Sequence, residues 1–261
     1  MQTRSGAEIT VYGDVVHKLH RPGTDPHALS ARLRAARRLE VVLTPLSERP
    51  EPVGDRWRSR WPEVETLAAQ PESVPWADIA QVLARLHTSA LPERLPAHGW
   101  PARLRRAIPR TRRPGGEVIR RAAAALPAQA WRAGSADRPR TLVHGDFHLG
   151  QLGRRDPAGP WALIDIDDLG VGDPAWDLAR PAGFWAAGLI PDEDWELFLD
   201  AYRAAGGPAL PLPDPWPVLE PFARAAVIQA AANTPDDDLL VAACARMPQL
   251  EKNSRPKPCL R

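Results

Sequence analysis

The chain has 261 residues, of which 44% are apolar and 25% are charged, and its formal net charge at pH 7 is only +2. These values are typical of a globular protein and give no electrostatic reason to expect a nucleic-acid partner. The first ten residues lack the apolar core of a signal peptide, and no segment approaches 18 consecutive apolar residues, so neither secretion nor membrane spanning is predicted. Only two cysteines are present, which favours a reducing, cytoplasmic compartment over a disulfide framework.

The first part of the chain predicts a small mixed lobe. Residues 8–12 and 15–19 are short β-branched or apolar runs around a Gly-Asp turn, which predicts a hairpin. Asp25 and Pro26 supply an N-cap and a first-turn proline, and this predicts a helix that ends near Leu39. Two further strands are expected, at residues 41–43 and 56–61.

The rest of the chain is predicted to be mostly helical. Residues 76–87 place apolar side chains at three- and four-residue spacing after a proline, and further helices are expected at residues 117–126, 195–205 and 222–233. The fold class predicted is therefore α+β, with two lobes. The small, abbreviated mixed lobe covers residues 1–67, the mostly helical lobe covers residues 68–247, and the basic, proline-rich residues 248–261 are predicted to form a disordered tail.

The segment from His144 to Gln151 reads HGDFHLGQ, and an apolar run that ends at Asp165 follows it. A loop and a short hairpin are expected here. Phosphoryl transfer requires an aligned hydroxyl and a magnesium ion held against the β- and γ-phosphate oxygens. Asp146 could accept the hydroxyl proton, while Gln151 and Asp165 could supply the oxygen ligands that Mg²⁺ prefers.

This segment resembles the catalytic loop of the aminoglycoside phosphotransferase and choline kinase-like family, which has the protein-kinase-like fold. The family loop reads His-Gly-Asp, with Asn five residues after the Asp. Residues 164–179, IDIDDLGVGDPAWDLA, are similar to the block that follows in the same family, and the Leu-Ala-x-Leu-His pattern that ends at His87 is similar to its preceding helix. The resemblance implies that Asp146 is the catalytic base and that Gln151 and Asp165 bind Mg²⁺. Gln in place of the usual Asn is similar to some sugar kinases of the family, such as the maltokinases.

The same resemblance assigns a nucleotide site to the small lobe. It implies that Lys18 contacts the ATP phosphates, and that backbone groups of Glu65, Thr66 and Leu67 contact the adenine. Kinase-like folds brace this lysine with a Glu on the following helix, but here no Glu occurs before Glu40, so Glu40 or another acidic residue is expected to take that place. The glycine-rich phosphate loop is weakly represented.

The function that the resemblance implies is transfer of the γ-phosphoryl group from ATP or GTP to a hydroxyl of a small molecule. The acceptor expected first is an aminoglycoside-type antibiotic, and second a sugar, an amino sugar or an amino alcohol. Acidic groups at residues 192–196 and 236–238 could attract a polycation, or could simply complement the dipoles of helix starts. Nucleic acid and membrane are not expected as partners, and the sequence does not give the oligomeric state.

Two alternatives remain open. The chain could be a non-catalytic, kinase-like module that binds a nucleotide or another ligand. His144, Asp146 and His148 could instead be ligands of zinc or non-haem iron.

The remaining residues of the two blocks are interpreted as structural. Asp173 and Asp177 are expected to accept backbone hydrogen bonds that fix the loop, His148 to pack within it, and Asp167 and Asp168 to be solvated turn acids.

Overall fold

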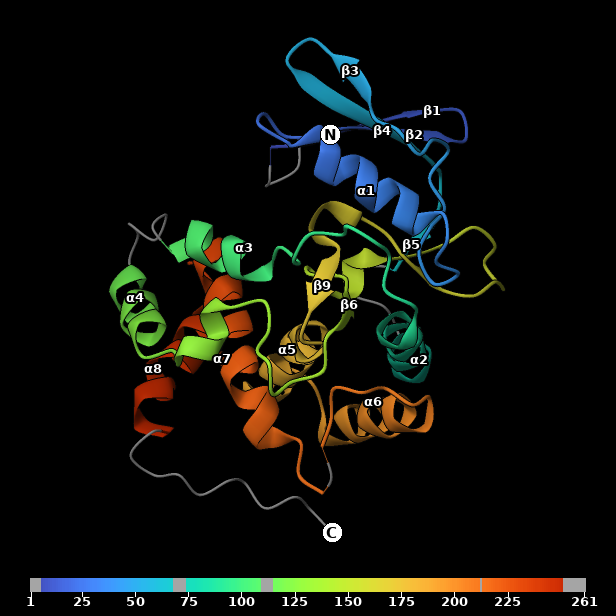
Figure 1. Cartoon of the computed structure of the whole chain (residues 1–261). Coiled ribbons are helices and arrows are strands. Elements are labelled where there is room, and N and C mark those ends of the chain that lie inside the picture. Colours follow the sequence, from blue (N-terminus) through green and yellow to red (C-terminus); the bar gives the residue numbers. More distant parts are fainter. Residues whose placement is uncertain (1–5, 68–73, 109–114, 212, 251–261) are drawn as a thin grey trace.

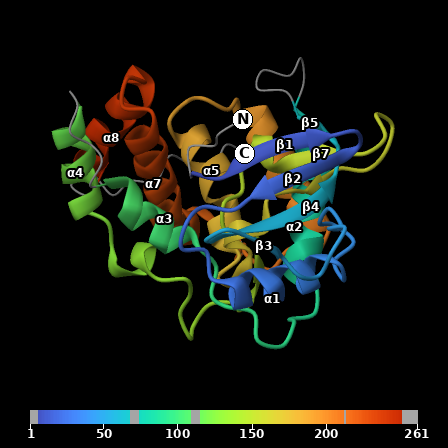
Figure 2. The ribbon, with the colours of Figure 1, turned by 90° about the horizontal axis from the view of Figure 1, so that it is seen from above.

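A four-stranded antiparallel sheet and one helix form the small lobe at the top of Figure 1. The computed structural model describes residues 6–67, 74–108, 115–211 and 213–250. The strand order is β1-β2-β4-β3, and Figure 2 shows these strands side by side from above. The elements are β1 (Glu8–Tyr12), β2 (Val15–Leu19), α1 (Pro26–Ala36), β3 (Glu51–Val53) and β4 (Arg56–Pro62).

Local sequence signals account for most of this lobe. Gly13 has φ 61°, the left-handed conformation that the β1–β2 turn requires, and the predicted hairpin is confirmed. The carboxylate of Asp25 accepts a hydrogen bond from the backbone N–H of His27 at 2.9 Å and caps α1 as predicted. The helix ends at Ala36, three residues before the predicted end at Leu39.

The strand predicted at residues 41–43 is not present. Val42 forms an isolated parallel bridge with Leu163, and backbone hydrogen bonds link Val41 and Leu43 to the same residue. This apolar segment is therefore attached to a hairpin of the other lobe rather than to the small-lobe sheet. Its apolar character is explained by burial between the lobes, since all three residues are buried.

The larger lobe is mostly helical, as predicted. In it, α5 packs mainly against α7, and α2 packs against α6. The ring centroid of Trp176 on α5 lies 5.0 Å from that of Trp100 and 4.8 Å from that of Phe222. No helix within the described ranges is long and apolar enough to cross a membrane. The helices are α2 (Trp76–Thr88), α3 (Trp100–Ala107), α4 (Gly116–Ala124), α5 (Ala175–Ala186), α6 (Asp192–Ala204), α7 (Trp216–Asn233) and α8 (Asp238–Leu250).

The predicted tail begins inside the last helix. Residues 248–250 belong to α8, whereas residues 251–261 lie outside the described residues. The helices α3, α5 and α8 were not predicted, because short, alanine- and proline-rich segments carry a weak helical period.

Two small sheets lie between the helices and carry the motif loops. Leu152 pairs with Leu163, and the backbone N–H of Ile164 donates to the carbonyl of Gln151 at 2.9 Å, so the predicted hairpin is confirmed. This pairing brings Gln151 and Asp165 to the same end of the hairpin. One sheet contains β5 (Glu65–Thr66), β7 (Leu152–Arg154) and β8 (Ala162–Leu163), and the other contains β6 (Thr141–Val143) and β9 (Gly170–Gly172); the 3₁₀ turns are η2 (Ala128–Trp131), η3 (Leu149–Gln151) and η4 (Ile166–Asp168).

The close approach of α5 and α7 gives a stability prediction at Gly183. A Cβ atom at this position would lie 2.6 Å from the carbonyl oxygen of Ala223 and 2.9 Å from Cγ2 of Val227. In an open helix, Gly→Ala stabilises by up to about 1 kcal/mol. Here we expect Gly183→Ala to destabilise the fold by roughly 1–3 kcal/mol, because the helices must separate. Thermal unfolding measures the effect, and a rise in Tm would contradict the packing.

Candidate active site

The loop after β6 is held by one buried carboxylate. Asp177, which is fully buried on α5, accepts hydrogen bonds from the backbone N–H groups of His144 at 2.6 Å and Gly145 at 3.0 Å. Gly145 has φ 82°, and a Cβ atom there would lie 2.2 Å from the carbonyl oxygen of Asp168. Glycine is therefore required at this turn, which directly precedes Asp146. The predicted role of Asp177 in fixing the loop is confirmed.

Asp177 is held in turn by groups from two other helices. His87 of α2 lies with Nε2 3.2 Å from the Asp177 carboxylate and with Nδ1 2.7 Å from the hydroxyl of Tyr202 on α6. The Tyr202 hydroxyl accepts from the backbone N–H of Ala209 at 3.2 Å, which leaves its proton for His87 Nδ1. Although burial opposes ionisation, the hydrogen bond from His87 helps to hold the pKa of Asp177 below its ordinary value.

Asp173 has a different structural role. Its carboxylate accepts the backbone N–H of Ala175 at 3.0 Å, where it caps α5, and it pairs with Arg138 at 2.8 Å. The expected hydrogen bond to backbone is present, but it fixes the start of α5 rather than the catalytic loop.

The carboxylate of Asp146 has two different oxygen environments. Oδ2 lies 2.6 Å from Nη2 of Arg103, whose Nη1 donates to Asp168 at 2.8 Å. Oδ1 is buried and has no hydrogen-bond partner in the described part of the chain. Burial raises the pKa of Asp146 to about 6, against the opposing charges of Arg103 and Arg180. Near neutral pH the group is therefore a carboxylate with one oxygen free to accept a proton.

Lys18 receives its carboxylate partners from the loop after β8. Its Nζ lies 2.6 Å from Asp165 and 2.9 Å from Asp167, and the other oxygen of Asp167 lies 3.1 Å from Nδ1 of His20. Burial opposes the charge of Lys18, but these carboxylates raise its pKa above the ordinary value. Glu40 is exposed and forms no ion pair within the described residues, so the missing helix carboxylate is replaced by two aspartates of η4 and its cap.

Gln151 faces the ring of His148. The Gln151 Nε2 and His148 Nε2 atoms are 3.1 Å apart, and the backbone N–H of Gly150 donates to His148 Nδ1 at 3.1 Å. Burial, with the nearby charge of Arg180, lowers the pKa of His148 to about 3, so the ring is neutral. A neutral imidazole has one donor and one acceptor nitrogen. Because Nδ1 accepts from Gly150, Nε2 carries the proton and donates to the amide oxygen of Gln151, which places that oxygen on the side of the ring. The oxygen keeps a second lone pair with which it can face a metal.

The donor set at the end of the β7–β8 hairpin fits a divalent cation. Asp165 and Asp167 already hold the Lys18 ammonium, a cation, and the Asp165 side chain is 38% exposed. Mg²⁺ is usually bound by one or two carboxylates together with substrate phosphates. Asp165 and Gln151 suit that pattern.

The alternative zinc or iron site is not supported. The described residues contain no group of three or more His, Cys, Asp or Glu side chains that could hold a metal ion. Nε2 of His144 lies 2.7 Å from the carbonyl oxygen of Ile164, and His148 is engaged within its own loop.

The predicted adenine segment lies beside the same hairpin. Glu65 and Thr66 form β5, which pairs with β7, and the backbone N–H of Leu67 donates to Leu152 at 3.1 Å. Antiparallel pairs alternate between hydrogen-bonded and non-hydrogen-bonded residues. The backbone N–H and C=O of Thr66 therefore point away from β7.

Sequence reasoning missed several residues of this site. The interpretation of Asp167 and Asp168 as solvated turn acids is wrong, because Asp167 pairs with Lys18 and Asp168 pairs with Arg103. Arg103, which lies in an arginine-rich stretch, was not among the predicted site residues. A signal was present: Arg103 is three residues after Trp100 and four before Ala107, both buried, and so lies on the inner face of α3.

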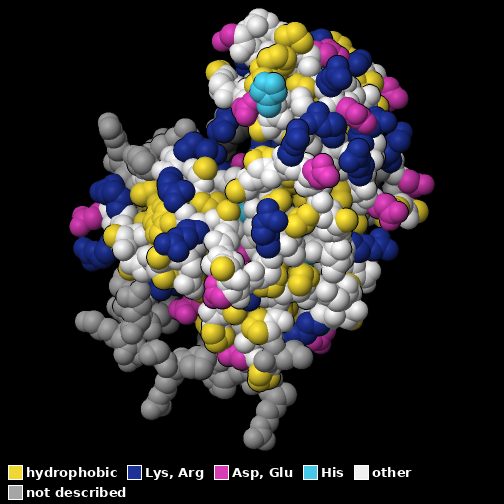
Figure 3. Space-filling view, viewed as in Figure 1, with side chains coloured by type: hydrophobic (Ala, Val, Ile, Leu, Met, Phe, Trp, Pro, Cys, Tyr) yellow, Lys and Arg dark blue, Asp and Glu magenta, His cyan; other side chains and the backbone are white. Residues whose placement is uncertain are grey.

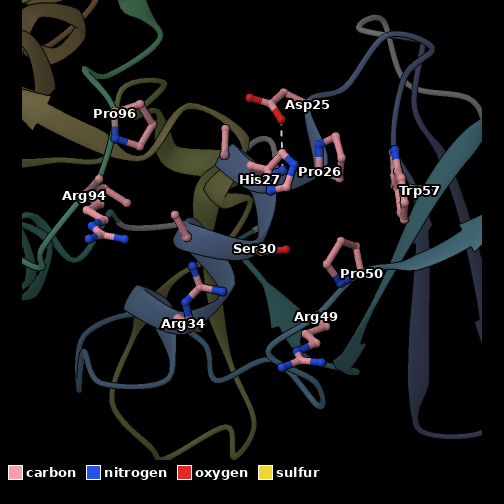
Figure 4. Close-up of a pocket in the computed structure, with 13 residues that line it drawn as sticks. Asp25, Pro26, His27, Ser30, Arg34, Arg49, Pro50, Trp57, Arg94 and Pro96 are labelled. Carbon is pink, nitrogen blue, oxygen red and sulfur yellow. Dashed lines mark hydrogen bonds between the residues drawn. The ribbon is translucent and has the colours of Figure 1, made fainter.

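The cavity shown in Figure 4 is separate from this site. It measures about 780 Å³ and lies between α1, the segment before β3 and the segment before α3; its lining includes Arg34, Arg49, Trp57 and Arg94. Figure 3 shows basic side chains on this face of the small lobe. Lys18, Asp146 and Asp165 do not line it, and its three arginines are exposed at the surface.

Comparison with known proteins places the chain in one family and its fold among related structures. The model of the phosphotransferase enzyme family matches residues 10–222. A choline/ethanolamine kinase family protein from Mesorhizobium loti has a similar structure, with a TM-score of 0.58 and 17% identity over 98% of this chain and 87% of that chain. The aminoglycoside phosphotransferase APH(3'')-Id from Streptomyces rimosus gives 0.55 and 18% over 92% and 93%. Choline kinase LicA from Streptococcus pneumoniae gives 0.59 and 16% over 98% and 86%. A comparison with curated proteins finds no match.

The environment of Asp146 predicts a pH profile. Because a base works only when deprotonated, kcat/KM for phosphoryl transfer is expected to fall as pH drops through about 6, the raised pKa of Asp146. Arg103→Gln removes the adjacent positive charge and should move this limb to higher pH. The exposed Arg121→Gln is the control and should leave the limb in place. A limb near 4, or one that Arg103→Gln does not move, would contradict the assignment.

Proposed function

Because the chain belongs to the phosphotransferase enzyme family, we propose that it transfers the γ-phosphoryl group of ATP or GTP to a hydroxyl group of a small molecule. The observation that carries this proposal is the state of Asp146. Its carboxylate is buried and fixed on one side by Arg103, and its other oxygen has no partner within the described residues.

Asp146 acts as the base in this proposal. The acceptor hydroxyl donates its proton to Oδ1, its oxygen forms a bond to the γ-phosphorus, and the bond from that phosphorus to the β-phosphate oxygen breaks, so the nucleoside diphosphate leaves with the electron pair. Arg103 keeps Oδ2 engaged, which fixes the carboxylate plane and directs Oδ1 to the acceptor. The raised pKa of about 6 keeps Asp146 basic enough to share the proton at neutral pH.

The nucleotide is expected to lie between the lobes. Lys18 would exchange its contacts with Asp165 and Asp167 for contacts with the phosphates, because an ammonium and a metal ion compete for the same carboxylate oxygens. The backbone N–H and C=O of Thr66, with Glu65 and Leu67 beside it, would recognise the base. Because main-chain atoms would recognise the base, the side chains of this segment do not indicate whether ATP or GTP is preferred.

Asp165 and Gln151 would hold the Mg²⁺ that accompanies the nucleotide. When bound, the ion neutralises the charge that develops on the phosphate oxygens. Asp167, which also contacts His20, would orient the loop that carries Asp165.

The acceptor is proposed to be a small molecule because the similar structures include choline kinases, aminoglycoside phosphotransferases and an aminopropanol kinase. At 18% identity or less these structures share the fold alone, so the acceptor class has to come from the residues of this chain. The non-catalytic alternative was favoured by a lysine without a carboxylate partner on the following helix, by the weak phosphate loop and by Gln151. Since Lys18 has two carboxylate partners, the first of these arguments no longer supports it.

Replacement of the base tests the proposal directly. Asp146→Asn should lower ATP turnover with an acceptor by on the order of 10²–10⁴, while nucleotide affinity changes little. Asp168→Asn is the matched control, since it also removes a carboxylate from Arg103 but leaves the base, and its loss should stay within about tenfold. Steady-state kinetics and calorimetry measure both quantities. Equal turnover of Asp146→Asn and the unmodified protein would remove Asp146 from this role.

Replacement of the proposed metal ligand tests a different step. Asp165→Ala should lose the part of ATP affinity that depends on Mg²⁺, because Asp165 joins the protein to the ion. Titration of ATP with Mg²⁺ and with a chelator measures that part, and the exposed turn variant Asp156→Ala is the control. If affinity is the same with and without Mg²⁺ in both Asp165→Ala and the unmodified protein, the metal assignment is wrong.

A further inference from the structure

Arg180 is a cation beside the catalytic loop that no predicted role explains. It lies on α5, and its Nη2 donates to the side-chain oxygen of Gln229 at 3.0 Å. Gln229 lies on α7 and is 2% exposed. The Arg180 Nε atom is also buried and has no hydrogen-bond partner in the part of the chain that the structure describes.

Three other cations around the site each face a carboxylate, while Arg32 donates to the backbone carbonyl of Leu169 at 2.8 Å. Lys18 faces Asp165 and Asp167, Arg103 faces Asp146 and Asp168, and Arg138 faces Asp173. Arg180 forms no ion pair with any described carboxylate, and its observed partner is a neutral amide. A charge taken out of water without a counter-charge is unfavourable. Burial accordingly lowers the pKa of Arg180, and the Asp146 carboxylate, which forms no ion pair with it, opposes this only in part.

Arg180 acts on the reacting end of the site. Arg180 lies three residues after Asp177 on α5 and therefore on the same face of the helix, and the Asp177 carboxylate binds the backbone of the catalytic loop. In agreement with this position, the charge of Arg180 opposes the rise in the pKa of Asp146. Arg180 belongs to α5 and its partner Gln229 to α7, both in the larger lobe, whereas Lys18 belongs to the sheet of the small lobe (Figure 1). The uncompensated charge therefore lies on the helical side of Asp146 and not on the side of the nucleotide lysine.

We infer that the acceptor of this enzyme carries an anionic group, a carboxylate or a phosphate ester, and that Arg180 binds this group while the acceptor hydroxyl approaches Oδ1 of Asp146. This inference rests on the proposed function. The anionic group supplies the counter-charge that Arg180 lacks, through charge-assisted hydrogen bonds that a guanidinium forms with carboxylate and phosphate alike. Arg103 is not assigned this role, because two aspartates already balance its charge.

The same charge disfavours a polycationic acceptor, which was the class expected first from the sequence. That expectation drew support from two acidic groups. Residues 192–194 occupy the first turn of α6 and Asp238 that of α8, where acids complement the helix dipole. Asp192 in addition accepts a hydrogen bond from Nε1 of Trp185 at 2.7 Å. These acids are therefore explained by their helices, and an acceptor ammonium group would meet Arg180 as a like charge.

The experiment compares acceptors that differ in charge on two carbon skeletons, those of glycerol and glucose, with kanamycin added as a polycation. The anionic set is glycerate, glycerol 3-phosphate, glucuronate and glucose 6-phosphate; the neutral parents are glycerol and glucose; the cationic set is glucosamine and kanamycin. Dissociation constants are measured for the protein saturated with Mg-ADP, and transfer from labelled ATP is measured in parallel. At least one anionic compound should bind about tenfold more tightly than its neutral parent, and the carboxylate and phosphate members separate the two anion chemistries.

Three variants assign the preference to Arg180. Arg180→Gln should bring the anion to within about threefold of its neutral parent, and Arg180→Lys should retain part of the preference. Gln229→Glu places a carboxylate at the observed contact, so Tm should rise while anion affinity falls. If Arg180 were merely structural, Gln229→Glu would raise Tm without lowering anion affinity. The exposed Arg121→Gln should change neither.

Three results would overturn the inference: anions that bind no better than their neutral parents, a cationic compound that binds best or is phosphorylated fastest, or a Gln229→Glu protein with raised Tm and unchanged anion affinity. Failure of the proposed function looks different. In that case Mg-ADP does not bind, or no acceptor of any charge supports ATP turnover, whereas failure of the present inference leaves Mg-ADP binding and turnover intact.

Discussion

The active site depends on the hydrogen bonds that the buried Asp177 carboxylate accepts from the backbone of the catalytic loop. One oxygen receives the N–H of Gly145, and the other receives the N–H of His144 together with the contact from His87. These bonds join helix α5 to the loop, and the link from His87 to Tyr202 extends the connection to α2 and α6. Because Asp177 is fully buried, an unfilled acceptor position would be costly, so the loop backbone is confined to one arrangement.

The charged side chains of the site lie around this loop in two groups. Asp146 and Asp168 share Arg103, while Asp165 and Asp167 share Lys18. Each cation thus contacts one carboxylate with a proposed role in the reaction, Asp146 or Asp165, and a second carboxylate beside it. In the proposed reaction, Lys18 must exchange its carboxylates for phosphates when nucleotide and metal arrive, whereas Arg103 must keep Asp146 in place.

The sequence predicted what local patterns determine. The β1–β2 hairpin, the Asp25 cap, the hairpin between Gln151 and Asp165 and the turn at Gly145 all depend on residues close together in the chain. The pairs Lys18–Asp165 and Arg103–Asp168 join residues that are 147 and 65 positions apart, and no period or motif encodes such contacts. The apolar residues 41–43 show the same limit, because burial between lobes and membership of a sheet give the same local pattern.

The two arginines beside the base illustrate why charge alone does not define a role. Arg103 is engaged by two carboxylates, which balance its charge, and can fix the orientation of Asp146. Arg180 is held by a neutral amide, which orients the guanidinium without compensating its charge. A glutamate in place of Gln229 would stabilise the fold more, since it would supply the counter-charge that Arg180 lacks. The neutral residue leaves that charge available, and the consequence is a site at which an incoming anion is stabilised in the position from which its hydroxyl can reach Asp146.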